Sequence, residues 1–331
     1  MSMKSIFAPH ERKKIYSGAN SAIWHSHGLA RSLAKSAVRE EDYVATFVTD
    51  TIPYLVDRWA PLLLNKGITL NVSGVFCHGH PRVEFGSPCR RIELADLLVV
   101  HQHANAGRVT ARAMLIQAKM SEDSTHSLSL SDAQLELFSN WPPFKFVTGG
   151  LPSDSRDIKE RGKGSRYALV FDGQAYPEDI EWADQCPWAA SVAKPDLTGD
   201  SSLAQVLGDM LLDIDGRPFN LGNTTDDWSR TIRDLLRITG LRTYKRTSMG
   251  RGHIPRLSDG STPAGLMCFH GSGYATGVQG RKPKTLQERF FNNVPLIQDG
   301  GAGAGTFLME EVEQKPGGIS TLIIDTATGL G

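Results

Sequence analysis

Two strand-like runs joined by a tight turn constrain the fold of this 331-residue chain more than any other feature. The segments IELADLLVVHQH (92–103) and VTARAMLIQAKM (109–120) are rich in apolar and β-branched residues, and Asn105-Ala106-Gly107 lies between them. This pattern predicts an antiparallel β-hairpin. Counting back equally from the turn brings Asp96 close to the level of Gln117, and alternation of side chains along each strand puts Lys119 on the same face as Gln117.

A helix and a strand are predicted before the hairpin. Apolar residues recur at steps of three and four between positions 40 and 65, which is typical of one buried face of a helix. Pro53 and Pro61 interrupt this pattern, so we expect kinks or two consecutive helices. The β-branched run at 68–76 then predicts a strand.

A helix and further strands are predicted after the hairpin. Ser131 and Gln134 form a capping box that opens a short helix, which Pro142-Pro143 ends. The runs 144–148 and 166–171, one or both, are expected to continue the sheet. The resulting order is a helix, three strands, a helix and a strand.

The second half of the sequence predicts a mixed α+β region. Residues 202–213, with a capping box at Ser202 and Gln205, and residues 227–239 are expected to be helices, and 319–326 a terminal strand. We therefore divide the chain into a domain at 1–160 and a C-terminal region at 161–331. That region is either separate or packed on the same sheet.

Asp96, Gln117 and Lys119 bring three kinds of polar group to one edge of the predicted hairpin. A carboxylate binds Mg²⁺, a side-chain oxygen completes the hard coordination shell, and an ammonium steadies the attacking water or the charge that builds on phosphate. Because burying an unpaired lysine is costly, Asp96 is expected to be the partner of Lys119. This set predicts hydrolysis of a phosphodiester. The alternative is that Asp96 and Lys119 are ordinary solvated residues at a sheet rim.

The order of elements, with Glu93-Leu-Ala-Asp96 and Gln117-Ala118-Lys119, resembles the PD-(D/E)XK nuclease superfamily in its Gln-X-Lys variant, which Mrr-like restriction enzymes carry. The resemblance covers roughly residues 20–170. It implies a restriction-endonuclease-like α/β core in the order αβββαβ, with a mixed sheet flanked by helices. It also implies that Asp96 binds the metal, Gln117 contributes its side-chain oxygen, the Ala118 carbonyl faces the ion, and Lys119 positions the nucleophilic water.

Members of that superfamily often add a glutamate from the preceding helix. We choose Glu41 for this role as a catalytic residue and metal ligand, because it lies beside the buried face of the predicted helix. Glu40, Glu84 and Glu93 compete with it. In a regular strand Glu93 would point to the face opposite Asp96. A glutamate in the first turn of a helix also has the simpler role of interacting favourably with the helix dipole.

Histidine pairs offer a rival metal site. On a strand, histidines two residues apart share a face, which suits Zn²⁺. No complete set of zinc ligands with a familiar spacing accompanies them, and loop histidines are often simply exposed. The residues concerned are His25 and His27, His78 and His80, and His101 and His103, with Cys77 and Cys89 nearby.

Basic residues gather in the second half of the chain. Residues 228–257 carry eight Lys and Arg side chains and a single Asp. On a helix Arg230, Arg233 and Arg237 share one face, and Lys245 and Arg246 follow, so this segment is a candidate nucleic-acid-binding surface. The alternative is a solvated helix face whose arginines pair with acids elsewhere.

Composition limits the classes of function. With 36 basic and 36 acidic residues the formal net charge is zero, which argues against coating nucleic acid by bulk charge but allows a local basic groove. The start of the sequence lacks the apolar run of a signal peptide, and no run of 18 apolar residues occurs. The four cysteines show no CxxC spacing. We therefore expect a cytoplasmic protein without a membrane span.

The sequence and the resemblance together predict a Mg²⁺- or Mn²⁺-dependent endonuclease that hydrolyses double-stranded DNA. By analogy with the superfamily, we expect a bacterial restriction or anti-phage effector that forms homo-oligomers and acts with an operon-encoded protein partner. One alternative is a catalytically degenerate nuclease fold that serves as a DNA-binding or interaction subunit, with Gln117 marking lost metal affinity. Another is a zinc-dependent hydrolase built on the histidine pairs.

Overall fold

The computed structural model describes residues 3–33, 37–77, 81–148, 150–159, 163–172, 186–222, 225–241, 245–247, 266–273, 284–291, 296–298, 308–310 and 318–328. Its helices are α1 (Met3–Ile6), α2 (Pro9–Leu33), α3 (Glu40–Leu64), α4 (Ala133–Asn140), α5 (Leu203–Leu211), α6 (Asp227–Leu241) and α7 (Leu286–Phe290). Its strands in the first half are β1 (Thr69–Cys77), β2 (Arg82–Phe85), β3 (Arg90–Glu93), β4 (Leu97–Asn105), β5 (Arg108–Ser121), β6 (Thr125–Ser127) and β7 (Phe144–Phe146). The later strands are β8 (Ser165–Phe171), β9 (Trp188–Ser191), β10 (Asp196–Thr198), β11 (Ser201–Ser202), β12 (Arg217–Pro218), β13 (Lys245–Thr247), β14 (Leu266–Gly273), β15 (Leu296–Gln298), β16 (Leu308–Glu310) and β17 (Ser320–Thr328).

A mixed sheet forms the centre of the molecule, which confirms the α/β class. Within the described residues it runs β11-β9-β8-β5-β4-β17-β1-β14-β15, and β12 pairs with β5 outside this path. The terminal strand β17 lies between β1 and β4, parallel to β4 and antiparallel to β1. Because β8 also joins the sheet, parallel to β5, residues on both sides of position 160 build one sheet.

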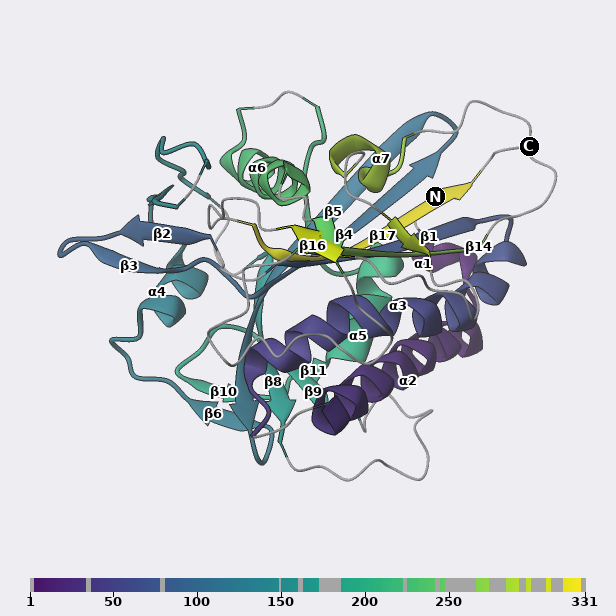
Figure 1. Ribbon diagram of the computed structural model, residues 1–331, viewed down its shortest axis with the longest axis horizontal. Helices are drawn as coiled ribbons and strands as arrows, with labels where there is room; N and C mark the ends of the chain where they lie inside the picture. Colours follow the sequence, from purple (N-terminus) through teal and green to yellow (C-terminus); the bar gives the residue numbers. More distant parts are fainter. Residues whose placement is uncertain are drawn as a thin grey trace.

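Helices cover both faces of this sheet (Figure 1). Figure 1 shows α2, α3 and α5 below the central strands and α6 and α7 above them. One apolar core joins α2, α3 and α5 to residues such as Val99 and Met114, and a second core joins α4, α6 and α7 to residues such as Val100 and Leu115. Successive strand residues therefore alternate between two cores, so the hairpin is buried on both faces.

The hairpin predicted from the sequence is confirmed. Residues of β4 and β5 pair from Asn105 and Arg108 at the turn to Leu97 and Ile116. The two turn residues have positive φ angles, 45° at Ala106 and 80° at Gly107, which is the pattern of a two-residue turn whose twist suits a hairpin.

The strand expected at 92–103 is interrupted. β3 ends at Glu93 and belongs to a separate sheet of order β3-β2-β7, and β4 begins only at Leu97. Of the two runs expected to continue the sheet, 166–171 does so as β8. The run 144–148 contains β7, which pairs with β2 in the small sheet. The strand at 92–103 is interrupted because residues 94–96, with buried Leu94 and Ala95, carry the chain from the small sheet to the main sheet.

The helix before the hairpin is one continuous element. α3 contains both Pro53 and Pro61, so of the two expectations, kinks or two consecutive helices, the second is wrong. Tertiary packing holds it together: a Cβ added to Gly74 of β1 would lie 1.7 Å from the Val48 carbonyl oxygen of α3. This close approach fixes α3 on the sheet.

Two helix starts were predicted from capping boxes. For α5 the prediction is confirmed, since the Ser202 hydroxyl accepts from the Gln205 N–H at 3.0 Å. For α4 the cap is Asp132 and not Ser131, because the Asp132 carboxylate accepts from the Leu135 N–H at 2.8 Å. The Asp132 carboxylate, one residue closer to the helix than Ser131, therefore occupies the N-cap position.

No helix in the described parts of the chain combines the length and apolar character that crossing a bilayer requires.

Candidate active site

Asp96 and Gln117 face each other across the start of the hairpin. The pairing of Leu97 with Ile116 puts them at one level, as the count from the turn predicted. The Gln117 Nε2 donates to Asp96 Oδ2, and the Ala118 backbone N–H donates to the same oxygen at 2.7 Å. Two donors on one oxygen hold this carboxylate in a single position.

The backbone before β4 also orients Asp96. Its N–H donates to the Ile116 carbonyl at 3.0 Å, which extends the hairpin ladder by one residue beyond the strand. Asp96 is 8% exposed and Gln117 is 7% exposed, so both side chains are buried. A buried carboxylate is normally accompanied by such donors.

The Gln117 side-chain amide uses its nitrogen to bond Asp96, and its oxygen takes no part in that hydrogen bond. Among the described residues, Gln117 Oε1 is buried and has no hydrogen-bond partner. The resemblance implied that this oxygen binds a metal, and an orphaned carbonyl oxygen beside a carboxylate suits a hard cation. The resemblance also implied that the Ala118 carbonyl faces the metal. The N–H of the same residue donates to Asp96.

Lys119 lies two residues further along β5 and is half-buried. The sequence argument made Asp96 its partner, and this is wrong: within the described residues no carboxylate lies within 4.0 Å of the Lys119 ammonium. Asp96 is held instead by amide donors. Because Lys119 is less buried than expected, water compensates its charge without an acid.

These side chains line one cleft of about 200 Å³ where four elements meet. The first turn of α3 and the last residues of β1 form part of its wall. Glu93 at the end of β3 and Asp96 before β4 contribute two acids, and β5 contributes Gln117 and Lys119. The lining residues are Glu40, Glu41, Val44, Phe76, Cys77, Glu93, Asp96, Gln117 and Lys119.

Two of the glutamates considered from the sequence enter the cleft from α3. The Glu40 carboxylate accepts from the Met120 N–H of β5 at 3.0 Å. Glu41 pairs with Arg39 at 2.9 Å and its side chain is 38% exposed. Both therefore line the cleft, but Glu40 is the one bonded to β5, which a sequence pattern alone does not reveal.

The other two candidates separate. Glu93 lines the cleft together with Asp96, contrary to the regular-strand expectation, because the chain leaves β3 between them. Glu84 lies on β2 and pairs with Lys145 at 2.7 Å and Arg91 at 3.1 Å. These two cations hold the pKa of Glu84 below its usual value.

The oxygen atoms of the described cleft residues are of the kind that binds Mg²⁺ or Mn²⁺, but they do not form a complete set of ligands. Within the described residues no three His, Cys, Asp or Glu side chains gather as ligands. The cleft nevertheless holds carboxylates and the orphaned Gln117 oxygen, the ligand atoms these ions prefer. The residues therefore fit such a cation, with Asp96, Gln117 and a glutamate of α3 as the groups that would hold it.

No family model, no curated protein and no solved structure matches the chain. The function therefore has to be inferred from the chemistry of the cleft residues.

The histidine pairs at 25 and 27 and at 101 and 103 do not line the cleft. His101 Nε2 and His103 Nδ1 each lie 2.9 Å from the hydroxyl of Thr326 on β17. Burial, with a smaller contribution from His103, lowers the pKa of His101 to about 3. Asp213 Oδ1 lies 3.6 Å from His101 Nδ1, but no third ligand joins them among the described residues.

The pair at 25 and 27 does not have the expected geometry. Both residues lie in α2, where positions two apart diverge by about 200° around the axis, so they do not share a face. His25 contacts Tyr54, with ring centroids 3.9 Å apart, and His27 stacks on Tyr43 at 4.6 Å. His78 and His80 lie outside the described residues.

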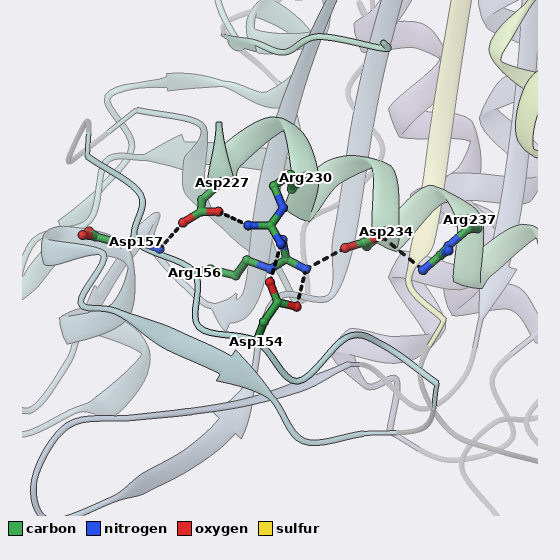
Figure 2. Close-up of polar contacts among 7 residues, drawn as sticks. All are labelled: Asp154, Arg156, Asp157, Asp227, Arg230, Asp234 and Arg237. Atoms are coloured by element: carbon green, nitrogen blue, oxygen red, sulfur yellow. Dashed lines mark hydrogen bonds and ion pairs between the residues drawn. The ribbon is translucent and has the colours of Figure 1, made fainter. Parts of the chain in front are cut away.

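The arginines of α6 have intramolecular partners (Figure 2). Arg230 donates to Asp227 at 2.7 Å and to Asp154, and Arg237 donates to Asp234 at 3.3 Å. Arg233 donates to the Gly222 carbonyl at 2.6 Å.

Arg156 completes this network from below α6. It is 1% exposed and donates to Asp234 at 2.7 Å and to Asp154 at 3.3 Å. Among the described residues three acids thus pair with three of the four arginines, as the alternative interpretation of this face had it. Lys245 and Arg246 lie in β13, where the backbone is described but the side chains are not.

Proposed function

We propose that this chain is a metal-dependent nuclease that hydrolyses DNA phosphodiester bonds. The observation that carries the proposal is the placement of Asp96, Gln117 and Lys119 in one cleft with the acids of α3. Hydrolysis forms a bond from a water oxygen to phosphorus and breaks one phosphorus–oxygen bond to the sugar. The departing oxygen takes up a proton, and the water has lost one.

The charge of the cleft favours a metal in this reaction. Among its described lining residues, four carboxylates, those of Glu40, Glu41, Glu93 and Asp96, face one ammonium, that of Lys119. Such a cleft repels a phosphodiester. A bound Mg²⁺ or Mn²⁺ would reverse this repulsion and polarise the phosphoryl group.

Each protein residue has a separate task. Asp96, held by two donors, offers its carboxylate to the cation, and Gln117 offers Oε1. Lys119 lies beside them without an acidic partner among the described residues, so its ammonium is available to orient the attacking water or to meet charge that develops on phosphate. Glu40 or Glu41 completes the set from α3.

The order of elements supports the same proposal. α3, β1, β4, β5, α4 and β8 come in the order of the expected αβββαβ core, although β2, β3, β6 and β7 lie between them in the chain. β4 is antiparallel to β5, and β8 is parallel to β5. β17 is a departure, since it separates β1 from β4.

Plasmid cleavage tests the proposal. The protein is incubated with supercoiled plasmid and Mg²⁺ or Mn²⁺, and Asp96→Asn and Lys119→Met are compared with the wild type. Both variants are expected to lose at least about a hundredfold in rate, since each removes a group acting on the transition state. Glu122→Gln is the matched control, because Glu122 follows β5 directly, is exposed and lies outside the cleft lining.

The outcomes separate the alternatives. A folded wild type that binds DNA without cutting it in either metal contradicts nuclease activity and favours the interaction-subunit alternative. Cleavage that survives in both variants contradicts the assignment of the site. Stoichiometric zinc in the purified protein, found by elemental analysis, would favour the zinc hydrolase.

A further inference from the structure

Two adjoining cavities open beside β12, on the half of β5 that lies towards the hairpin turn. Their volumes are about 580 and 610 Å³, and Pro218 and Asp226 line both. Cationic side chains dominate their walls: Arg112, Lys163, Arg166 and Arg217 in the first, and Arg108 and Arg289 in the second.

Positive charge is concentrated in these cavities. Among the described lining residues, six cationic side chains face two carboxylates, those of Asp215 and Asp226, an excess of four. Asp213, whose Oδ1 lies 3.5 Å from Arg112 Nε, reduces the excess to three. Because the whole chain is neutral, this excess is a local feature that attracts anions.

The wall between the cavities and α6 is fixed. Arg217 is 8% exposed, and its guanidinium lies over the Trp228 ring at 5.1 Å from the centroid. Gly164 has a φ of 86°, and a Cβ there would lie 2.7 Å from the same ring, so only glycine fits. On the opposite side Asp215 holds Arg166 at 2.9 Å. Arg166 and Arg217 are therefore positioned before any ligand arrives.

One polar group in the first cavity lacks a partner. Ser165 is 5% exposed, and among the described residues its hydroxyl makes no hydrogen bond. An unsatisfied buried hydroxyl is unfavourable, and a ligand oxygen that accepts its proton would remove that cost.

We propose that these cavities form a second anion-binding site that takes a phosphate-bearing ligand, either a nucleotide or a stretch of nucleic-acid backbone. The volumes suit a ligand of that size, and arginine is the preferred partner of phosphate. Five residues of β5 separate Arg112 from Gln117, about 17 Å along the strand, and no residue lines both the cleft and the cavities. The site therefore goes beyond the proposed nuclease cleft.

Calorimetric titration in EDTA tests the site without metal-dependent chemistry. Pyrophosphate, ATP and a hexathymidylate oligonucleotide are titrated into the wild type and into a triple variant, Arg108→Gln, Lys163→Gln and Arg289→Gln. These three side chains are exposed, so the fold is expected to survive. The variant is expected to bind at least tenfold more weakly and to show a shallower dependence on salt, because fewer cations meet the phosphates.

A matched triple variant controls for bulk charge. Lys13→Gln, Lys14→Gln and Lys145→Gln remove the same charge from exposed positions outside both cavities. Ser165→Ala tests the hydroxyl without altering charge, and weaker binding of pyrophosphate or ATP is expected.

The outcomes are decisive in both directions. Binding of ATP and pyrophosphate alone identifies a small phosphorylated ligand, and binding of the oligonucleotide alone identifies a strand. A wild type that binds none of the three, or an equal loss in both triple variants, overturns the proposal. Asp96→Asn is expected to bind normally, so failure of plasmid cleavage and failure of this site can be told apart.

Discussion

Gln117 donates its side-chain amide to the same Asp96 oxygen that accepts the Ala118 N–H at 2.7 Å. Gln117→Glu would put a second carboxylate against this oxygen. Without metal the two negative charges repel, and a loss of stability of about 1–3 kcal/mol is expected from the broken hydrogen bond. Because a second carboxylate strengthens a magnesium site, Mn²⁺ or Mg²⁺ should raise the melting temperature more in Gln117→Glu than in the wild type.

Gln117→Met is the control for that experiment. It removes the hydrogen bond without adding charge, so it should lose stability without gaining a response to metal. Equal metal-induced shifts in melting temperature for the two variants would contradict a cation beside Asp96.

The hairpin and its polar end were predictable because they depend on local rules. Alternation along two strands and a turn at Asn105-Ala106-Gly107 fix which residues face one another, and nothing distant alters that register. The place of β17 between β1 and β4 was not predictable, since it depends on pairing over more than two hundred residues.

The rest of the candidate site depended on contacts between elements. The sequence pattern favoured Glu41, but the bond of Glu40 to Met120 follows from how α3 crosses the sheet at Gly74. The α6 arginines form a basic face in sequence, and only the fold brings Asp154 against them. The cavities beside β12 likewise gather cations from four segments that are far apart in sequence.

Glu40 and Glu41 should contribute unequally to cleavage. Glu40 is bonded to β5 beside Lys119, whereas Glu41 turns to Arg39 at 2.9 Å. Glu40→Gln is therefore expected to lower the cleavage rate by about tenfold or more, and Glu41→Gln by less, since a positioned carboxylate stabilises the transition state better than a mobile one. Initial rates on plasmid at saturating Mg²⁺ measure both, and the reverse order would restore Glu41 as the ligand.

Arg156 should be far more important for stability than the exposed arginines near it. It is 1% exposed, and its removal leaves Asp234 and Asp154 without their buried partner. Arg156→Met is expected to cost about 1–3 kcal/mol, the range for losing buried hydrogen bonds to charged groups, since Arg230 and Arg237 still pair with the two acids. Arg237→Met, at a side chain 58% exposed, should cost less than about 1 kcal/mol. Urea denaturation of both variants checks this, and similar midpoints would show that the network in Figure 2 does not clamp residues 154–157 to α6.

Stability should fall as the pH is lowered from 6.5 towards 4, because of buried histidine. Burial, with a smaller effect of the Arg31 charge, lowers the pKa of His27 from 6.5 to about 4, and the ring is 1% exposed against Tyr43. Between these values the unfolded chain binds a proton that the folded chain does not, so stability is complete above pH 6.5 and declines below it. One such histidine contributes at most about 1.4 kcal/mol per pH unit.

His27→Phe keeps an aromatic ring on Tyr43 and should reduce this slope, as measured by urea denaturation at pH 7, 6 and 5. His10→Phe, at an exposed position of the same helix, should leave the slope unchanged. A wild-type stability that is flat over this range would contradict a neutral, buried His27.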